Sequence, residues 1–255
     1  MLSGINLLNF YDRQAPGALV EPMRKEFHLS DTKIGLLGSV FIWVYALAGL
    51  PLGRVVDVWS RKKLLAIGVT VWSALTAASG LATSFSFLLF TRLGVGIGEA
   101  VCAPAGTSWI GDLFPVKRRA RVLSLFMLGV PVGGALSFLL CGPIAQRWGW
   151  RTAMVSAAAP AILLVPLLLL LREPARGASE ETLAAESKGS LSTLLRVPTL
   201  WWIILSGALF NFNMYALGTF LPAFMTRVHG YSVAHAGVTS GIVDRKSTRL
   251  NSSHT

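Results

Sequence analysis

The sequence predicts an all-helical protein that crosses a membrane several times. Of its 255 residues, 53% are hydrophobic and only 14% are charged, whereas globular domains carry about 25% charged residues. The mean hydropathy of +0.59 arises from apolar runs close to the ~20 residues that cross a bilayer. A soluble helical core fits poorly, because soluble helices show polar faces and these runs mostly do not.

Seven apolar runs are long enough to span a bilayer, and an eighth begins near the end of the chain. The first run is the least uniform, because it contains Asp12 and Arg13. The predicted spans are Leu2–Met23, Ile34–Gly53, Leu64–Thr83, Phe87–Ile110, Val122–Ile144, Ala153–Leu171, Leu200–Met225 and the partial span Ser232–Val243.

The spans fall into two groups, separated by the long polar stretch 172–198. We predict a six-helix bundle over residues 1–171, a solvated central loop over 172–198 and the opening of a second bundle over 199–243. Residues 244–255 resemble the translation of a sequencing adapter, and we interpret them as an artefact outside the fold; a natural basic tail is the alternative. We expect the natural protein to continue beyond Val243.

The net charge of +11 invites a nucleic-acid partner, but the distribution of the charge argues against one. If the loop after the second span is cytoplasmic, twelve Lys and Arg residues lie on that side and six on the other. This is the positive-inside pattern. It predicts a multi-pass protein of the plasma membrane, surrounded by lipid, with the N-terminus and the central loop in the cytoplasm.

A faint internal repeat relates two stretches of the predicted first bundle. GRVVDVWSRK begins at Gly53 and GPIAQRWGWR at Gly142, an offset of 89 residues that also pairs Lys62 with Arg151. Three spans separate the copies, so they lie on opposite sides of the membrane. That arrangement is typical of the inverted 3+3 repeats of secondary transporters.

Ionisable residues lie inside two of the predicted spans, where each charge costs at least ~2.5–3.5 kcal/mol. Asp12 and Arg13 lie in the first span, with Asp12 roughly 16 Å along the helix. Arg92 and Glu99 share a face of the fourth span, because they are about two turns apart. We expect these groups to meet in a hydrated centre, either to bind substrate and protons or as a static Arg13–Glu99 pair.

Three motifs carry a resemblance to a known family. GRVVDVWSRKK, from Gly53 to Lys63, resembles the cytoplasmic loop motif of the major facilitator superfamily, although Ser60 replaces a usual glycine. RLGVGIGEA in the fourth span resembles the spinster-like branch, and LLNFYDR in the first span resembles both that branch and the organic anion–proton symporters. The similarity covers Asn6–Pro174 and, more weakly, Leu200–Val243. It implies the superfamily fold, with its first, fourth, seventh and tenth helices around a central cavity.

The resemblance implies a monomeric secondary active transporter of a small organic or amphipathic anion, coupled to protons and working by alternating access. A lysolipid or sphingolipid exporter of the spinster kind is the alternative within this class. A membrane-embedded lipid-modifying enzyme is the alternative from another class, but it needs a His–acid pair or activated nucleophile at membrane depth, which the chain does not offer. We therefore expect no enzyme, no metal site and no cofactor besides an ion gradient.

The candidate site residues form three sets. For the cavity they are Asp12, Arg13, Arg92, Glu99, Asn211, Asn213 and Tyr215, with direct bonding between helices as the alternative for the last three. For a conformational lock on the cytoplasmic side they are Gly53, Asp57, Arg61 and Asp112, with plain positive-inside anchoring as the alternative. For close helix packing they are Gly94, Gly98, Gly129, Pro131 and Gly133.

Overall fold

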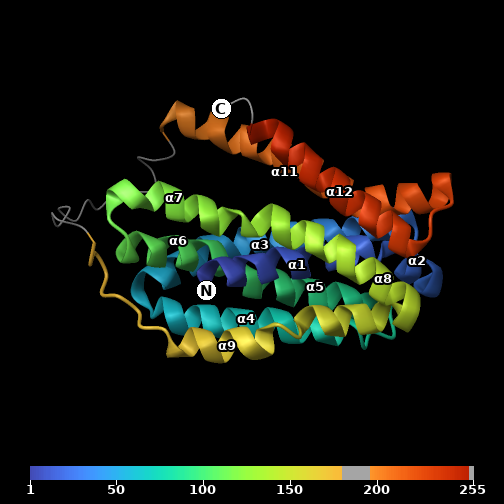
Figure 1. Cartoon of the computed structure of the whole chain (residues 1–255), viewed down its shortest axis with the longest axis horizontal. Helices are drawn as coiled ribbons and strands as arrows, with labels where there is room; N and C mark the ends of the chain where they lie inside the picture. The colour runs from blue at the N-terminus through green and yellow to red at the C-terminus, as the bar shows by residue number, and fades with distance from the viewer. Residues whose placement is uncertain (180–195, 253–255) are drawn as a thin grey trace.

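The computed structural model describes residues 1–179 and 196–252, and the described residues form helices and turns without a strand (Figure 1). The helices are α1 (Leu2–Ala18), α2 (Val20–Phe27), α3 (Asp31–Val58), α4 (Arg61–Ser79), α5 (Phe85–Glu99), α6 (Cys102–Leu113), α7 (Val116–Met127), α8 (Gly129–Ala158), α9 (Ala161–Leu170), α11 (Pro198–His229) and α12 (Val233–Ser252).

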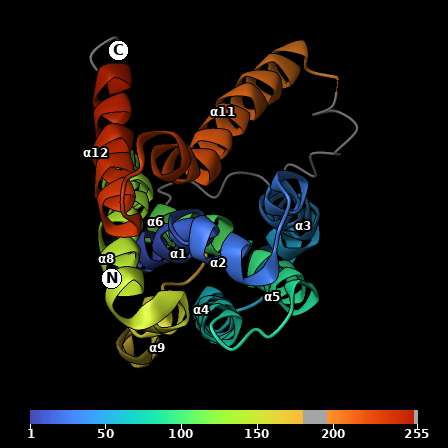
Figure 2. The same ribbon diagram turned by 90° about the vertical axis from the view of Figure 1, so that its right-hand side faces the viewer.

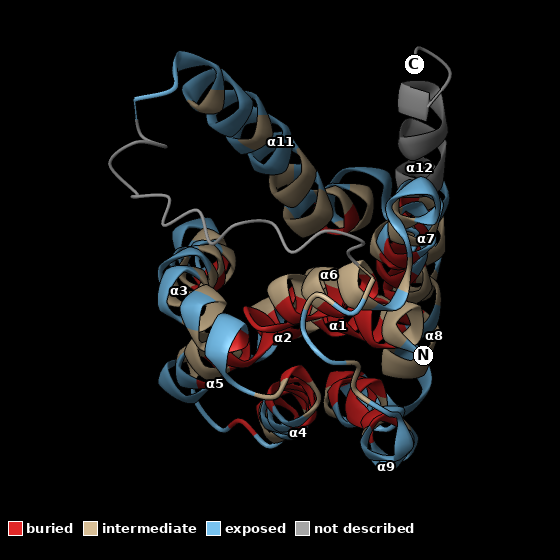
Figure 3. Cartoon of the chain, turned by 90° about the vertical axis from the view of Figure 1, so that its left-hand side faces the viewer, coloured by how far each residue is buried: buried red, intermediate tan, exposed pale blue. Residues whose placement is uncertain are grey.

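Helix α1 lies in the centre of the first bundle and packs most extensively against α8 (Figure 2). Helices α3 and α5 flank it on one side, while α4 and α9 form the edge farthest from α11. Helices α11 and α12 pack on the opposite side, against α1, α2 and α8. Buried residues concentrate on α1, α4 and the facing sides of their neighbours (Figure 3). The core is therefore built around the helix that carries Asp12 and Arg13.

Proline explains why two predicted spans are each divided into two helices. Proline has no backbone N–H and its ring clashes with the carbonyl four residues earlier. Pro104 thus disfavours a continuous helix at Ala100, where α5 and α6 are separated, and Pro131 does so at Met127, where α7 ends. In the fifth span, the single residue Leu128 accordingly separates α7 from α8.

The reversal between the fifth and sixth spans lies at Gly149, inside α8. Its φ of 84° is in the left-handed region, which glycine adopts without the steric cost of a side chain. By length and composition, the described residues contain four helical stretches apolar enough to cross a membrane: Asp31–Val58, Phe85–Leu113, Val116–Leu170 and Pro198–His229. The third of these includes the reversal, so it amounts to two crossings.

The end of the chain differs from the prediction. We expected the apolar helix to be interrupted at Asp244, but α12 continues to Ser252. The added stretch contains Arg, Lys and Leu, which have good intrinsic helix propensity, so a helix can propagate through it without an apolar face.

Candidate functional site

A buried ion pair joins α1 to α5 at the centre of the bundle. Arg13 Nε lies 2.9 Å from Glu99 Oε2, and the two side chains are 5% and 0% exposed. Glu99 is the last residue of α5, directly before the interruption at Ala100. Because both charges are desolvated, removing either leaves the other buried without its partner.

Arg13 also connects α1 to α11 and to a cluster of aromatic rings. Its Nη1 donates to the Tyr215 hydroxyl at 3.0 Å, and its Nη2 donates to Asn9 Oδ1 at 3.2 Å. The guanidinium carbon lies 4.4 Å from the ring centre of Phe10 and 4.5 Å from that of Tyr45. Cation–π contacts of this kind stabilise a cation that has lost its water.

Asp12 and Arg92 complete a set of four buried ionisable groups, two carboxyl groups and two guanidinium groups. Asp12 is fully buried and accepts a 3.4 Å hydrogen bond from Ser73 of α4, while Arg92 donates to Ser79 at 3.1 Å. Asp12 is also within electrostatic range of Glu99 and Arg92. Asp12 Oδ1, Glu99 Oε1 and Arg92 Nε are buried without a hydrogen-bond partner among the described residues, so each retains bonding capacity.

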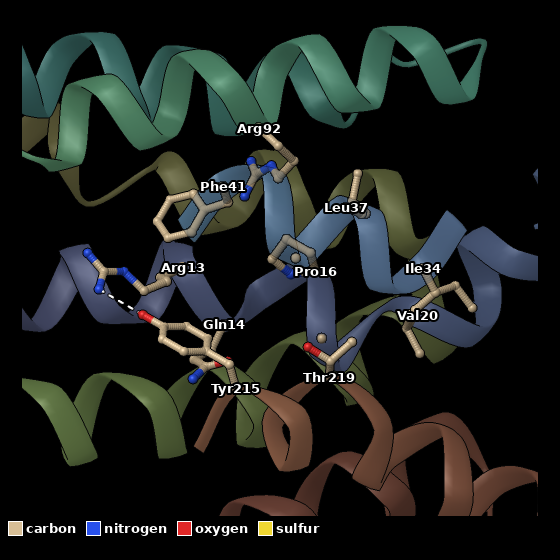
Figure 4. Close-up of a pocket in the computed structure, with 12 residues that line it drawn as sticks. Arg13, Gln14, Pro16, Val20, Ile34, Leu37, Phe41, Arg92, Tyr215 and Thr219 are labelled. Atoms are coloured by element: carbon tan, nitrogen blue, oxygen red, sulfur yellow. Dashed lines mark hydrogen bonds between the residues drawn. The ribbon is translucent and has the colours of Figure 1, made fainter. Parts of the chain in front are cut away.

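A small cavity of about 40 Å³ lies beside these charges, between α1, α3 and α11 (Figure 4). Its polar lining comes from Arg13, Gln14, Arg92, Tyr215 and Thr219, and the rest is apolar. A space of ~10–15 Å³ holds one water, so the cavity is large enough for a few. Figure 4 shows the Arg13–Tyr215 hydrogen bond at one end of it.

Of the three residues predicted on the seventh span, the structure brings only Tyr215 to the cavity. Asn211 and Asn213 are exposed, and the Asn211 amide donates to its own helix at Gly207 O, 2.8 Å away. The N-terminal half of α11 stands away from the first bundle (Figure 2). Among the described residues these two amides therefore neither line the cavity nor bond to another helix.

The predicted lock residues are only partly brought together. Arg61, 1% exposed, forms an ion pair with Asp112, linking α4 to α6. Asp57 is exposed and has no hydrogen bond or ion pair among the described residues. A Cβ at Gly53 would meet nothing within 4 Å among the described residues. Both residues lie near the end of α3, at the edge of the bundle.

The start of the central loop holds the same end of the bundle, and the sequence analysis missed it. Glu173 accepts hydrogen bonds from Ser60 Oγ at 2.5 Å and from the Arg61 backbone N–H at 2.7 Å, and it pairs with Arg61 Nε at 3.1 Å. Partial burial acts to raise the pKa of Glu173, but these bonds outweigh it and hold the pKa below its usual range. The carboxylate sits at the N-terminus of α4, where a negative charge is favourable.

Three of the five residues predicted for helix packing lie against a neighbouring backbone. A Cβ at Gly133 would be 2.3 Å from Leu7 O, and a Cβ at Gly98 would be 3.1 Å from Trp72 N. Gly129 packs against Leu7 N in the same way, whereas Gly94 meets a side chain and Pro131 lies in the first turn of α8. The fourth span therefore packs on α4, and the fifth packs on α1.

A second group of charges joins α11 to the first bundle at the end opposite Arg61. Arg227 Nε lies 2.5 Å from Glu21 Oε1 of α2, and its Nη1 lies 2.8 Å from Asp31 Oδ1 of α3.

Within the described residues there is no group of three His, Cys, Asp or Glu side chains that could hold a metal ion. Asn9, Ser73 and Ser79 complete the central network; the signal for Asn9 was its position one helical turn before Arg13.

Comparison with known proteins places this arrangement in a family. The Major Facilitator Superfamily sequence model matches residues 2–243, ending where the adapter-like stretch begins. An "MFS-type efflux pump" of Mycolicibacterium smegmatis is 34% identical over 95% of this chain and 57% of its own length. Human "Protein spinster homolog 1" is 33% identical over 89% of this chain and 42% of its own length. The chain thus spans about half the length of these relatives.

Solved structures give the same result. A bacterial homolog of the human lysosomal transporter Spinster, inward-facing and unoccupied, superposes with a TM-score of 0.86 at 34% identity, over 95% of this chain and 58% of that one. A D-xylose–proton symporter, at 16% identity and a TM-score of 0.69, shares the fold. These relatives are transporters, which confirms the prediction that the chain is no enzyme. The chain is a multi-pass membrane protein that belongs to the Major Facilitator Superfamily, in its spinster-like branch.

Proposed function

We propose that the protein to which this chain belongs is a secondary active transporter that works by alternating access. The observation that carries the proposal is the contact of Arg13 with both Glu99 and Tyr215. This contact links the first bundle to α11 through a buried charge, beside a cavity. Buried ionisable groups at membrane depth are costly and mark substrate or ion pathways.

Charge clusters at the two ends of the molecule support the proposal. The Arg61–Asp112 pair lies at one end, and Arg227 with Glu21 and Asp31 at the other. Arg227 joins α11 to the first bundle, and ion pairs at the interface of moving bundles can break and re-form as the bundles rock. The Arg61–Asp112 pair instead joins two helices of the first bundle and holds that end of it together. The resemblance to an inward-facing spinster homolog suits a state in which the Arg227 end is closed.

The substrate we propose is a small organic or amphipathic anion. Arg13 and Arg92 supply positive charge to the cavity, and Arg can hold a carboxylate or phosphate through two hydrogen bonds. Ile34, Leu37 and Phe41 supply apolar wall, which favours a substrate with a hydrocarbon part. The efflux-pump relative favours export, and the lysolipid type of substrate is then the amphipathic case.

Protons are the proposed coupling ion, and an ion gradient is the only cofactor. Asp12 and Glu99 each have an oxygen without a hydrogen-bond partner among the described residues, so each can accept a proton. Proton binding at such a site depends on neighbouring charges, and an arriving anion changes those charges. We place the protein in the plasma membrane as a monomer, with its N-terminus and central loop cytoplasmic, on the positive-inside pattern.

Reconstitution of the full-length protein in proteoliposomes tests the proposal. Radiolabelled sugar acids, other organic anions and lysophospholipids are added with and without a pH gradient. We expect at least one of these classes to move across the membrane, faster with the gradient than without it. Absence of flux for all classes in protein that remains folded contradicts the proposal.

A further inference from the structure

A large apolar groove lies on the outer face of the first bundle, away from the cavity described above. It has a volume of about 550 Å³ and lies between α4 and the segment from the end of α8 to α9. Five alanines line it, Ala74 and Ala158 among them, together with aliphatic residues of α9. The hydroxyls of Thr70 and Ser73 are the only polar side-chain groups in its lining.

The groove opens on the part of the protein that faces lipid. Helices α4 and α9 form the edge opposite α11 and α12 (Figures 2 and 3), and α12 packs mainly on α8. Large apolar side chains beside the groove are strongly exposed, with Ile162 at 74%, Leu163 at 70% and Ile67 at 54%. The groove is therefore continuous with the surface that the surrounding bilayer covers.

Water cannot fill this groove at low cost. A stable buried water needs two to four polar partners, and the lining offers only two hydroxyls, both of which already donate their protons within the protein. Thr70 Oγ1 donates to Ala66 O at 2.8 Å, and Ser73 Oγ donates to Asp12 Oδ2 at 3.4 Å. The apolar lining therefore favours a hydrocarbon occupant.

The size of the groove distinguishes a hydrocarbon chain from a helix of a second protein copy. A helix is about 10–12 Å across, so about one turn of it would occupy this volume. A single turn is too short to seat a membrane-spanning partner, whereas a flexible acyl chain is narrow enough to lie along alanine walls.

We propose that the groove between α4 and α9 is a binding site for one acyl chain of a bilayer phospholipid. The chain packs along Ala74 and Ala158 and reaches Ser73, the residue that holds Asp12 from the other side. The Ser73 side chain thus lies between lipid in the groove and Asp12 of the central network. This site is separate from the substrate cavity, and its existence does not depend on what the protein transports.

Photolabelling of the full-length protein tests the site. The probe is phosphatidylcholine with a diazirine near the end of one acyl chain, and labelled peptides are identified by mass spectrometry in liposomes. We expect enriched labelling of peptides 64–83 and 153–171 over the lipid-exposed helix α3. Ala74→Phe, which fills the groove, removes most of this labelling. Val71→Phe, on the same helix but outside the groove lining, leaves it unchanged.

A second variant and the outcomes that contradict the proposal complete the test. Thr70→Phe fills the groove from another exposed position and replaces Ala74→Phe if that variant does not yield folded protein. Labelling no greater than that of α3, or labelling that Phe at position 74 and Phe at position 71 reduce equally, overturns the proposal. A covalent link between two protein copies through these peptides also overturns it, in favour of a dimer contact.

Discussion

Lys62 and Arg151 hold opposite ends of the same helix pair. Lys62, at the start of α4, donates to Leu169 O and Leu171 O at the end of α9, at 3.3 and 3.2 Å. Arg151, before α9, donates to Ala82 O just after α4, at 2.7 Å. The two residues are 89 positions apart, which is the offset of the internal repeat. Each cation thus donates to backbone carbonyls at the end of the neighbouring segment, which is the arrangement that an inverted repeat predicts.

Removing Arg13 should destabilise the protein. Arg13→Ala leaves Glu99 buried without its cation, and breaking a buried pair costs about 3–5 kcal/mol. Thermal unfolding of the full-length protein in detergent measures the loss. Arg147→Ala, at an exposed arginine, serves as the control and should change little. Equal melting temperatures for both variants contradict a structural demand for the pair, and Arg13→Met combined with Glu99→Gln should recover part of the loss.

Neutralising Glu99 should uncouple transport from protons. Glu99→Gln retains the shape and accepts a hydrogen bond from Arg13 but cannot exchange a proton, so flux should no longer respond to a pH gradient. Exchange of labelled for unlabelled substrate, which needs no net proton movement, should persist. Glu26→Gln removes a half-exposed carboxylate at the bundle end and should leave the pH response intact. A wild-type pH profile in Glu99→Gln removes Glu99 from coupling.

The network around Glu173 should depend on acid pH. Because its folded-state pKa lies below the ordinary value, its carboxylate stabilises the folded state at neutral pH. That stabilisation is lost as the pH falls through about 4.3, the ordinary value, toward the lower folded-state pKa. Glu173→Gln should lower the melting temperature at pH 7 and abolish this contribution to the acid dependence between pH 6 and pH 3.5. Asp57→Asn, at an exposed acid without a partner among the described residues, is the control and should leave the melting temperature at pH 7 unchanged.

Loss of Arg227 should loosen the contact between α11 and the first bundle and raise access to the cavity. Arg227→Ala breaks both ion pairs between α11 and the first bundle, and coupling of this kind typically changes a conformational equilibrium about tenfold. A cysteine placed at Thr219, which lines the cavity, reports access from outside through its reaction with a membrane-impermeant maleimide. The rate should rise in Arg227→Ala and stay constant in Lys25→Ala. No change in rate would mean that other contacts keep this end shut.

Adding one methyl group at Gly133 should be poorly tolerated. The new Cβ would lie 2.3 Å from Leu7 O, so α1 and α8 must separate, and overpacking of this kind costs about 1–3 kcal/mol. Gly49→Ala is the control, because nothing lies within 4 Å of its Cβ position; in a helix it should be neutral or slightly stabilising. The melting temperatures of the Gly133→Ala and Gly49→Ala variants are compared. Equal values contradict the close contact between α1 and α8.

The sequence predicted best those residues whose burial in a membrane span has a high free-energy cost unless they are compensated. Charges at membrane depth, such as Arg13 and Glu99, must be compensated, so their burial and pairing could be anticipated from the apolar runs around them. Gly98 and Gly133 were likewise identified, because glycines in a membrane helix mark close packing. Pro131 was named only for close packing, and the end of α7 four residues before it was not predicted.

The sequence was a poor guide wherever contacts depend on the position of a distant element. Glu173 follows the sixth span like any loop acid, and nothing local indicates that it caps α4, 113 positions before it. Asn211 and Tyr215 are both polar residues in the same apolar run, but only Tyr215 lies where α11 contacts α1. Gly53 and Asp57 match a family motif, but their surroundings among the described residues are open.

The break after Glu99 has a mechanical consequence. Because α5 ends at Glu99 and α6 begins at Cys102, two turn residues with helical backbone angles, Ala100 and Val101, join the half of the fourth span that bears the central carboxylate to the half that bears Asp112. Pro104 leaves the Ala100 carbonyl without its helical donor, so bending at this hinge breaks no hydrogen bond there. A bend at this point would therefore move the segment that bears Asp112 without breaking the Arg13–Glu99 pair.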